Sequence, residues 1–206
     1  MVSKTEMDKG KVRTMLQRDD IAKIIEEYDR MKLRIGMTAS HSALDICDGG
    51  IEEGFPTVAY CQEGRHKTYA NYFKTKRSGS GRVLRGMVDK AIVMPSFNDV
   101  MDESMQVEMR KRNVVYIPNR SFTSYSSIED VENKFKVPLF GSRNMLRMEE
   151  RTEEQDYYWI LDKAGLPYPE AIENPEDIDC LVIVKLHHAQ KKLERGFFTC
   201  ASYQEY

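Results

Sequence analysis

The feature that most constrains this sequence is a repeated switch between two hydrophobic periodicities near its start. Residues 18–31 carry apolar side chains at helical spacing, and residues 33–39 then form a short apolar run typical of a buried strand. The alternation repeats at once, with helical spacing over residues 42–53 and a second strand over residues 57–61. Helices and strands that alternate through such short connections indicate a parallel sheet. We therefore expect an α/β fold with an open parallel sheet.

The rest of the chain continues this organisation. We expect strands at residues 91–94, 113–118, 178–185 and 196–202, and helices at residues 102–111, 128–135, 143–150 and 155–164. The basic, glycine-rich residues 74–86 are expected to form a mobile surface loop. The strands at residues 178–185 and 196–202, if antiparallel, would form a flap over ATP phosphates with the charged loop between them.

A change in composition near residues 150–170 indicates a domain boundary. We expect a helical extension over residues 1–30, an α/β domain over residues 31–150, and the beginning of a second domain over residues 151–206.

Charge and cysteine content narrow the class of protein. The 206 residues carry 31 lysines and arginines against 33 acidic residues, which argues against a general binder of nucleic acid or of membrane surfaces. No apolar run approaches the roughly 18 residues of a membrane span, and the charged first 20 residues do not fit a secretory signal. The four cysteines are widely spaced and form no CxxC pair. We expect reduced thiols and a cytoplasmic location.

The turn Ala39-Ser40-His41-Ser42 is the first candidate site, because it joins the first strand to the following helix. Open α/β sheets bind ligands at the carboxyl ends of their strands. The free N–H groups of the helix start suit a phosphate. Two serine hydroxyls and His41 can add donors. The alternative interpretation is a serine N-cap beside a histidine that only caps or packs.

Two further candidates follow later strands. Arg120 and Ser121 are expected in a loop after the fourth strand, where parallel strands would bring them to the same sheet edge as His41. A polar turn with a solvated arginine is the alternative. Lys185 ends the apolar run Val182-Ile183-Val184, and can hold an ammonium near phosphates while its stem stays buried. Most lysines at strand ends are merely surface residues.

A metal site within the chain is not expected. His187 and His188 are adjacent, so in a strand they would point to opposite faces. The neighbouring Lys191, Lys192 and Arg195 would repel a cation.

Several short segments occur in an order that points to one family. They are Thr38-Ala39-Ser40-His41-Ser42-Ala43-Leu44, Asp48-Gly49, Glu53-Gly54-Phe55, Cys61-Gln62-Glu63-Gly64-Arg65, Glu132-Asn133, Val137-Pro138-Leu139-Phe140-Gly141 and Pro175-Glu176-Asp177-Ile178-Asp179. In this order the chain resembles the archaeal formate-dependent ligases of AICAR (5-aminoimidazole-4-carboxamide ribonucleotide). The similarity runs in register from about residue 33 to the C-terminus.

The resemblance implies a Rossmann-like parallel sheet followed by the start of an ATP-grasp domain. It also implies an enzyme of IMP biosynthesis that uses ATP and Mg²⁺ to activate formate as formyl phosphate. The 5-amino group of AICAR then attacks the formyl carbon, giving the formamido product, ADP and phosphate. Members of this family tend to form symmetric homo-oligomers.

Site residues follow from the resemblance position by position. His41 and Ser121 match residues that contact AICAR. Lys185 matches the strand-end lysine of the ATP site, and Arg195 and Gly196 match the end of its phosphate loop. The acidic Mg²⁺ ligands would lie beyond Tyr206.

Two departures from the family pattern shape these expectations. Residues 186–194 are not glycine-rich, so the side-chain charges of Lys191, Lys192 and Arg195 would have to replace backbone donors. The sequence also stops at Tyr206, before the rest of an ATP-grasp domain. We therefore expect the chain to supply the ribonucleotide-binding part and not to turn over alone. The alternatives are a non-catalytic nucleotide-binding remnant, and an ATP-grasp carboxylate–amine ligase with another acid or amine.

Overall fold

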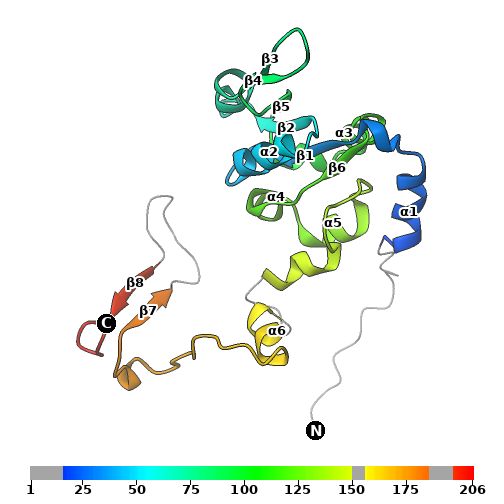
Figure 1. The fold of residues 1–206 in the computed structure, drawn as a ribbon. Helices are drawn as coiled ribbons and strands as arrows, with labels where there is room; N and C mark the ends of the chain where they lie inside the picture. The colour runs from blue at the N-terminus through cyan, green and yellow to red at the C-terminus, as the bar shows by residue number, and fades with distance from the viewer. Residues whose placement is uncertain (1–15, 150–155, 186–196) are drawn as a thin grey trace. The chain divides into compact units, whose positions relative to one another are not determined.

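The computed structural model describes residues 16–149, 156–185 and 197–206, and the chain divides into two compact units, residues 1–153 and 154–206 (Figure 1). The α-helices are α1 (Arg18–Glu26), α2 (Ala43–Glu52), α3 (Glu103–Lys111), α4 (Arg120–Tyr125), α5 (Ile128–Lys134) and α6 (Tyr157–Lys163). The strands are β1 (Arg34–Thr38), β2 (Thr57–Gln62), β3 (Lys76–Arg77), β4 (Val83–Arg85), β5 (Lys90–Met94), β6 (Val114–Tyr116), β7 (Val182–Lys185) and β8 (Phe197–Cys200). The short 3-10 and π-helical turns are η1 (Arg30–Lys32), η2 (Thr68–Tyr72), η3 (Phe97–Met101), η4 (Arg143–Glu149) and η5 (Pro175–Asp177).

A four-stranded sheet in the order β5-β2-β1-β6 forms the centre of the first unit, and all its pairings are parallel. The predicted open parallel sheet is therefore confirmed. The chain runs outward from β1 through β2 to β5, and then crosses back to place β6 on the other side of β1. The strand order thus reverses between β1 and β6. In open α/β sheets, ligands bind at the carboxyl ends of the strands at such a reversal.

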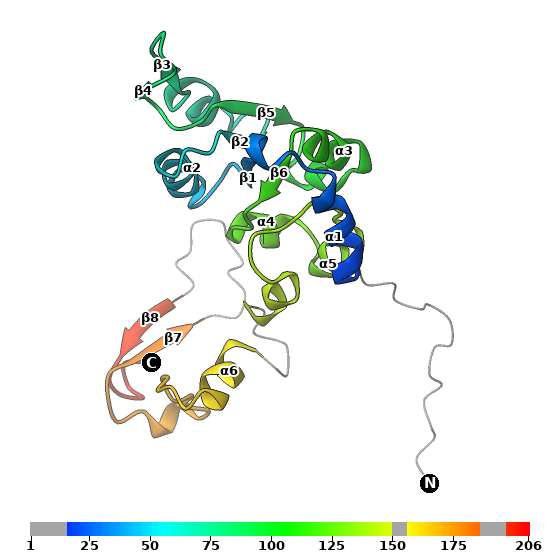
Figure 2. The same ribbon diagram turned by 45° about the vertical axis from the view of Figure 1, so that its right-hand side comes forward.

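Both faces of this sheet are buried. On β2, Val58 and Tyr60 enter one apolar cluster while Ala59 and Cys61 enter the other, as the alternation of side chains along a strand requires. The first cluster includes Met109 of α3 and Val131 of α5, and the second includes Ala43 and Cys47 of α2. Figures 1 and 2 accordingly show α2 and α3 on opposite sides of the sheet. Covered on both faces, the sheet leaves its carboxyl edge as the place for a site.

Three local predictions need correction. The segment expected to be a loop at residues 74–86 contains the antiparallel pair β3–β4, which is supported by hydrogen bonds from Arg77 to Asp89 and to the carbonyl of Gly81. The first helix ends at Glu26 instead of continuing to residue 31, and a separate turn, η1, follows Asp29. Arg120 and Ser121 belong to the first turn of α4 and not to a loop, because the Asn119 side chain caps that helix by accepting from the N–H of Phe122.

The second unit holds α6, η5 and the antiparallel pair β7–β8. The strand pairing agrees with the expected flap, although the intervening residues 186–196 lie outside the described residues. Apolar side chains on its surface include Leu181, Ile183 and Phe197. Among the helices that the structure describes, we find none with the length and apolar character needed to cross a membrane.

Candidate functional site

Asn119 ties together the two loops that flank the reversal in strand order. Its side-chain Nδ2 donates to the carbonyl oxygens of Thr38 and Ser40, at 2.8 and 3.1 Å. Its Oδ1 accepts from the N–H of Phe122, so one buried amide connects the end of β1 to the start of α4. The loop that carries His41 and the helix start that carries Ser121 are thereby held against each other.

Below these loops the two strands are joined by a buried hydroxyl pair. The Oγ1 of Thr38 and the Oη of Tyr116 lie 2.6 Å apart. Burial raises the pKa of Tyr116 far above its ordinary value, so the phenol keeps its proton at neutral pH. The contact gives the floor of the site a fixed hydrogen bond with no charge.

His41 occupies a strained position at the edge of the sheet. Its φ is 47°, in the left-handed region that residues other than glycine rarely adopt, and its side chain is exposed. Ser42 follows as the N-cap of α2, whose first N–H groups lack partners within the helix. Strain of this kind persists where the surrounding structure holds it, and it is concentrated at functional sites. The position of His41 therefore supports a ligand-facing role.

Ser121 presents an unsatisfied buried hydroxyl on the other side of the reversal. The residue is 0% exposed, and its Oγ has no hydrogen-bond partner within the described part of the chain. A buried hydroxyl without a partner costs roughly 1–3 kcal/mol. Other buried polar atoms of the described residues, Ser126 Oγ among them, also lack a partner, and Ser121 is singled out because it directly follows the reversal in strand order. Arg120, its neighbour, is exposed at the start of α4.

Arg65 is a site residue that the sequence reasoning did not assign. It follows β2, after Gly64 turns the chain with a φ of 79°. Its Nη2 donates to the Oγ of Ser40 at 3.1 Å, so a third strand end contributes to the same edge. The available signal was a glycine–arginine pair directly after a buried strand.

The remaining predicted residues lie elsewhere. Lys185 is the last residue of β7 in the second unit, and it is exposed. Arg195 and Gly196 lie outside the described residues. The structure places His41 and Ser121 at the same edge of the sheet, where Asn119 links their segments, and the roles of all five predicted residues remain predictions.

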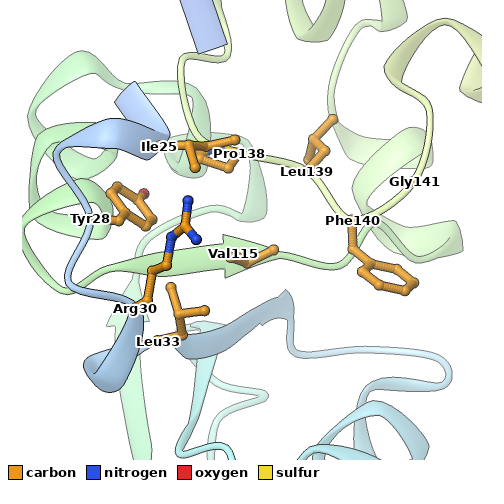
Figure 3. A pocket seen from close by; sticks show the side chains of 9 residues that line it. All are labelled: Ile25, Tyr28, Arg30, Leu33, Val115, Pro138, Leu139, Phe140 and Gly141. Carbon is orange, nitrogen blue, oxygen red and sulfur yellow. The ribbon is translucent and has the colours of Figure 1, made fainter. Parts of the chain in front are cut away.

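Two hollows of the first unit lie beside α1 and away from this edge. Figure 3 shows the smaller one, with a volume of about 340 Å³, whose lining residues are Ile25, Tyr28, Arg30, Leu33, Val115, Pro138, Leu139, Phe140 and Gly141. The larger one, about 640 Å³, lies between α1 and residues 139–144. Arg30 is the one charged residue that lines the smaller hollow. The mainly apolar lining of the smaller hollow does not suit a phosphate-bearing ligand. The lining of the larger hollow includes Arg18 and Arg143, but neither hollow is lined by His41, Ser121 or Arg65. We therefore place the candidate site at the carboxyl edge on its chemistry and not on the size of a hollow.

The donor set at this edge suits an oxyanion. Arginine, histidine, serine hydroxyls and helix N–H groups all donate hydrogen bonds, and three of these types gather around Ser40, His41 and Arg65. Metal coordination would need a cluster of at least three His, Cys, Asp or Glu side chains, and the described residues contain no such cluster.

Comparison with known proteins places the chain in a family. A family model described as "Protein of unknown function (DUF1246)" matches residues 35–172, from β1 into the second unit. The chain belongs to the DUF1246 family. The match covers the whole candidate edge.

Relatives of the DUF1246 chain carry a common name. This chain is 38% identical over 193 residues to the 5-formaminoimidazole-4-carboxamide-1-(beta)-D-ribofuranosyl 5'-monophosphate synthetase of Methanopyrus kandleri. The alignment covers 93% of this chain and 49% of that protein. The synthetase of the same name from Methanocaldococcus jannaschii is 35% identical over 193 residues, again covering 93% of this chain and 48% of the relative. The chain therefore spans about half the length of the curated relatives it matches. The resemblance inferred from the sequence segments is confirmed.

A solved structure agrees with the fold. The crystal structure of an IMP biosynthesis protein PurP from Thermococcus kodakaraensis superposes with a TM-score of 0.51 at 25% identity, covering 80% of this chain and 48% of the other.

Proposed function

We propose that this chain supplies the ribonucleotide-binding part of an ATP- and formate-dependent ligase that formylates AICAR in IMP biosynthesis. The observation that carries the proposal is the 38% identity, over 93% of the chain, to a synthetase named for the formamido product of that reaction. The matched half includes the whole carboxyl edge of the sheet.

The chemistry of the edge supports a ribonucleotide as the ligand. AICAR offers a phosphate, hydroxyls and a carboxamide, and all of these accept hydrogen bonds. His41 and Ser121 are proposed to donate to it from opposite sides of the reversal in strand order, where Asn119 links the loop after β1 to the start of α4. Ligand binding would satisfy the buried Oγ of Ser121, which lacks a partner within the described residues. It would also offset the backbone strain at His41.

ATP and Mg²⁺ are the proposed co-substrate and metal, and formyl phosphate is the proposed intermediate. Lys185, Arg195 and Gly196 are the proposed contributions of this chain to ATP phosphates. The described residues hold no acidic cluster for Mg²⁺, so we assign no metal ligand within them and derive no step through the ion.

Binding experiments test the proposal directly. The purified chain should be titrated by calorimetry with AICAR, with ATP and with adenosine 5'-monophosphate, in separate experiments. We expect saturable AICAR binding that is at least about 10-fold tighter than binding of adenosine 5'-monophosphate, because a site built for one base edge leaves polar groups unpaired with another. Absence of AICAR binding at millimolar concentration would overturn the proposal.

Turnover distinguishes the proposed ligase from its two alternatives. A fusion of this chain to the unmatched half of the Methanopyrus kandleri relative should convert AICAR to its formamido product in the presence of ATP and formate. A fusion that binds AICAR and ATP but forms no product would favour a non-catalytic remnant. A fusion that consumes ATP with another acid or amine, and not with formate and AICAR, would favour a different ligase.

A further inference from the structure

Arg65 is held in one conformation by side chains from three other parts of the first unit. Its Nη2 donates to Ser40 at 3.1 Å, and its Nη1 donates to the Oη of Tyr125 at 3.3 Å. Its guanidinium carbon lies 5.3 Å from the centre of the Phe97 ring. Phe97 and Tyr125 also pack against each other, with ring centroids 5.0 Å apart. The arginine therefore rests on a platform assembled from the β1 loop, η3 and α4.

The charge of Arg65 is not neutralised by these partners. Both of its hydrogen-bond acceptors are neutral hydroxyls, and none of the ion pairs formed among the described residues includes it. Long side chains lose up to about 2 kcal/mol of rotamer entropy when they are fixed. An exposed arginine that is ordered without a carboxylate partner is preorganised to bind an anion. Its planar guanidinium matches the geometry of an oxyanion, and the side chain loses little further entropy when the anion binds.

The hydroxyls around Arg65 extend this anion-binding character. A serine hydroxyl that accepts from a guanidinium retains its own O–H to donate. Ser40 can therefore accept from Arg65 and donate to a ligand. The buried Ser121 Oγ, without a partner in the described residues, adds an unsatisfied hydroxyl at the start of α4.

We propose that Arg65 recognises the phosphate monoester of the ribonucleotide, and so makes this chain select the ribonucleotide over the ribonucleoside. This inference rests on the proposed function for the identity of the base, and on the Arg65 contacts for the phosphate. Ser40, Phe97 and Tyr125 are positioning residues that fix the guanidinium. A dianionic phosphate would supply the anionic partner that Arg65 lacks among the described residues.

The test compares ligands that differ by the phosphate alone. Calorimetry on the full 206-residue chain should measure the affinities for AICAR, for its ribonucleoside and for ribose 5-phosphate. We expect Arg65→Ala to weaken AICAR binding about 10- to 100-fold, as for loss of a charge-assisted contact, and to leave the ribonucleoside affinity unchanged. The AICAR affinity of Arg65→Lys should lie between those of the wild type and Arg65→Ala, because lysine keeps the charge and lacks the planar guanidinium.

Arg82→Ala is the matched control, since Arg82 is an exposed arginine in the turn that connects β3 to β4. It should leave all three affinities unchanged. Equal weakening of nucleotide and nucleoside by Arg65→Ala would assign Arg65 a purely structural role and overturn the inference. Unchanged AICAR binding in the Arg65→Ala variant would also overturn the inference, and would leave the proposed function intact.

The ribose 5-phosphate measurement separates the two proposals. Arg65-dependent binding of ribose 5-phosphate without AICAR binding would support the phosphate site and overturn the proposed function. Failure of the wild-type chain to bind either ligand would overturn both.

Discussion

The side-chain Nδ2 of Asn119 lies 2.8 Å from the carbonyl oxygen of Thr38, across a separation of 81 residues in the sequence. This hydrogen bond crosses the point at which the strand order of the sheet reverses. The loop after β1 and the start of α4, the two candidate ligand-binding segments, therefore share one structural support, and the stability of the fold and the geometry of the site are coupled through it.

Replacing Asn119 with alanine should destabilise the first unit. The change removes both donations to carbonyl oxygens and the cap of α4, with an expected loss of about 2–4 kcal/mol in the free energy of unfolding. Urea unfolding followed by circular dichroism measures this loss. Asn98→Ala, at an exposed asparagine, is the control and should change stability by less than about 0.5 kcal/mol. Equal effects in the two variants would contradict the bridging role of Asn119.

Gly36 is expected to be intolerant of any side chain. A Cβ at this position in β1 would lie 2.5 Å from Val114 Cγ1 and 3.2 Å from the ring of Tyr60, both in the packed core. Gly36→Ala should therefore lower the unfolding free energy by about 3 kcal/mol through overpacking. Gly79→Ala is the matched control, because a Cβ there meets no atom within 4 Å. A thermal melt that moves equally for both variants would show that packing around Gly36 is looser than described.

The sheet and the position of its carboxyl edge followed from the sequence because they depend on local patterns. Apolar runs such as Val58 to Cys61, separated by helical periodicity, specify buried strands, and short connections favour parallel order. Asn119 was also readable as a helix cap, since asparagine is a preferred residue at that position. The six-residue α4 is nevertheless too short to show a hydrophobic period, so the sequence pattern favours a loop there.

The platform of Arg65 could not be predicted in the same way. It depends on Ser40, Phe97 and Tyr125, which come from three separate segments and meet only after the sheet has formed. The hydrophobic periodicity of each segment does not predict which distant segments come into contact. The β3–β4 pair was missed for a related reason, because its support comes from Asp89, outside the basic segment.

The buried thiols give a prediction with a defined pH dependence. Burial raises the pKa of Cys47 and of Cys61 from 9.0 to about 12. The folded state therefore holds these protons more tightly, and the resulting stability is present below pH 9 and is lost as the pH rises towards 12. Each thiol should cost about 1 kcal/mol of unfolding free energy between pH 8 and pH 10, measured by urea unfolding at both values.

Variants and chemical labelling check the assignment of this effect. Cys61→Ala should show a smaller decrease between pH 8 and pH 10 than the wild type, whatever its stability at pH 8. At pH 8 a thiol reagent should label Cys180, which is exposed, long before Cys47 and Cys61. Cys180→Ser should remove the fast phase. Rapid labelling of all the cysteines under native conditions would contradict the burial on which this prediction depends.

Ser121 should separate stability from binding. Its buried Oγ has no partner within the described residues, so Ser121→Ala removes an unsatisfied group and should leave the unfolding free energy unchanged or raise it by up to about 1 kcal/mol. The same change should weaken AICAR binding roughly 3- to 10-fold, because the proposed ligand contact is lost. Ser126→Ala is the matched control, since Ser126 is also buried, at the C-cap of α4, and its Oγ has no partner among the residues that the structure describes. That variant should show the same gain in stability and no change in affinity. Loss of stability in Ser121→Ala would mean that a partner for this hydroxyl exists within the fold, and the argument for a ligand at Ser121 would then fail.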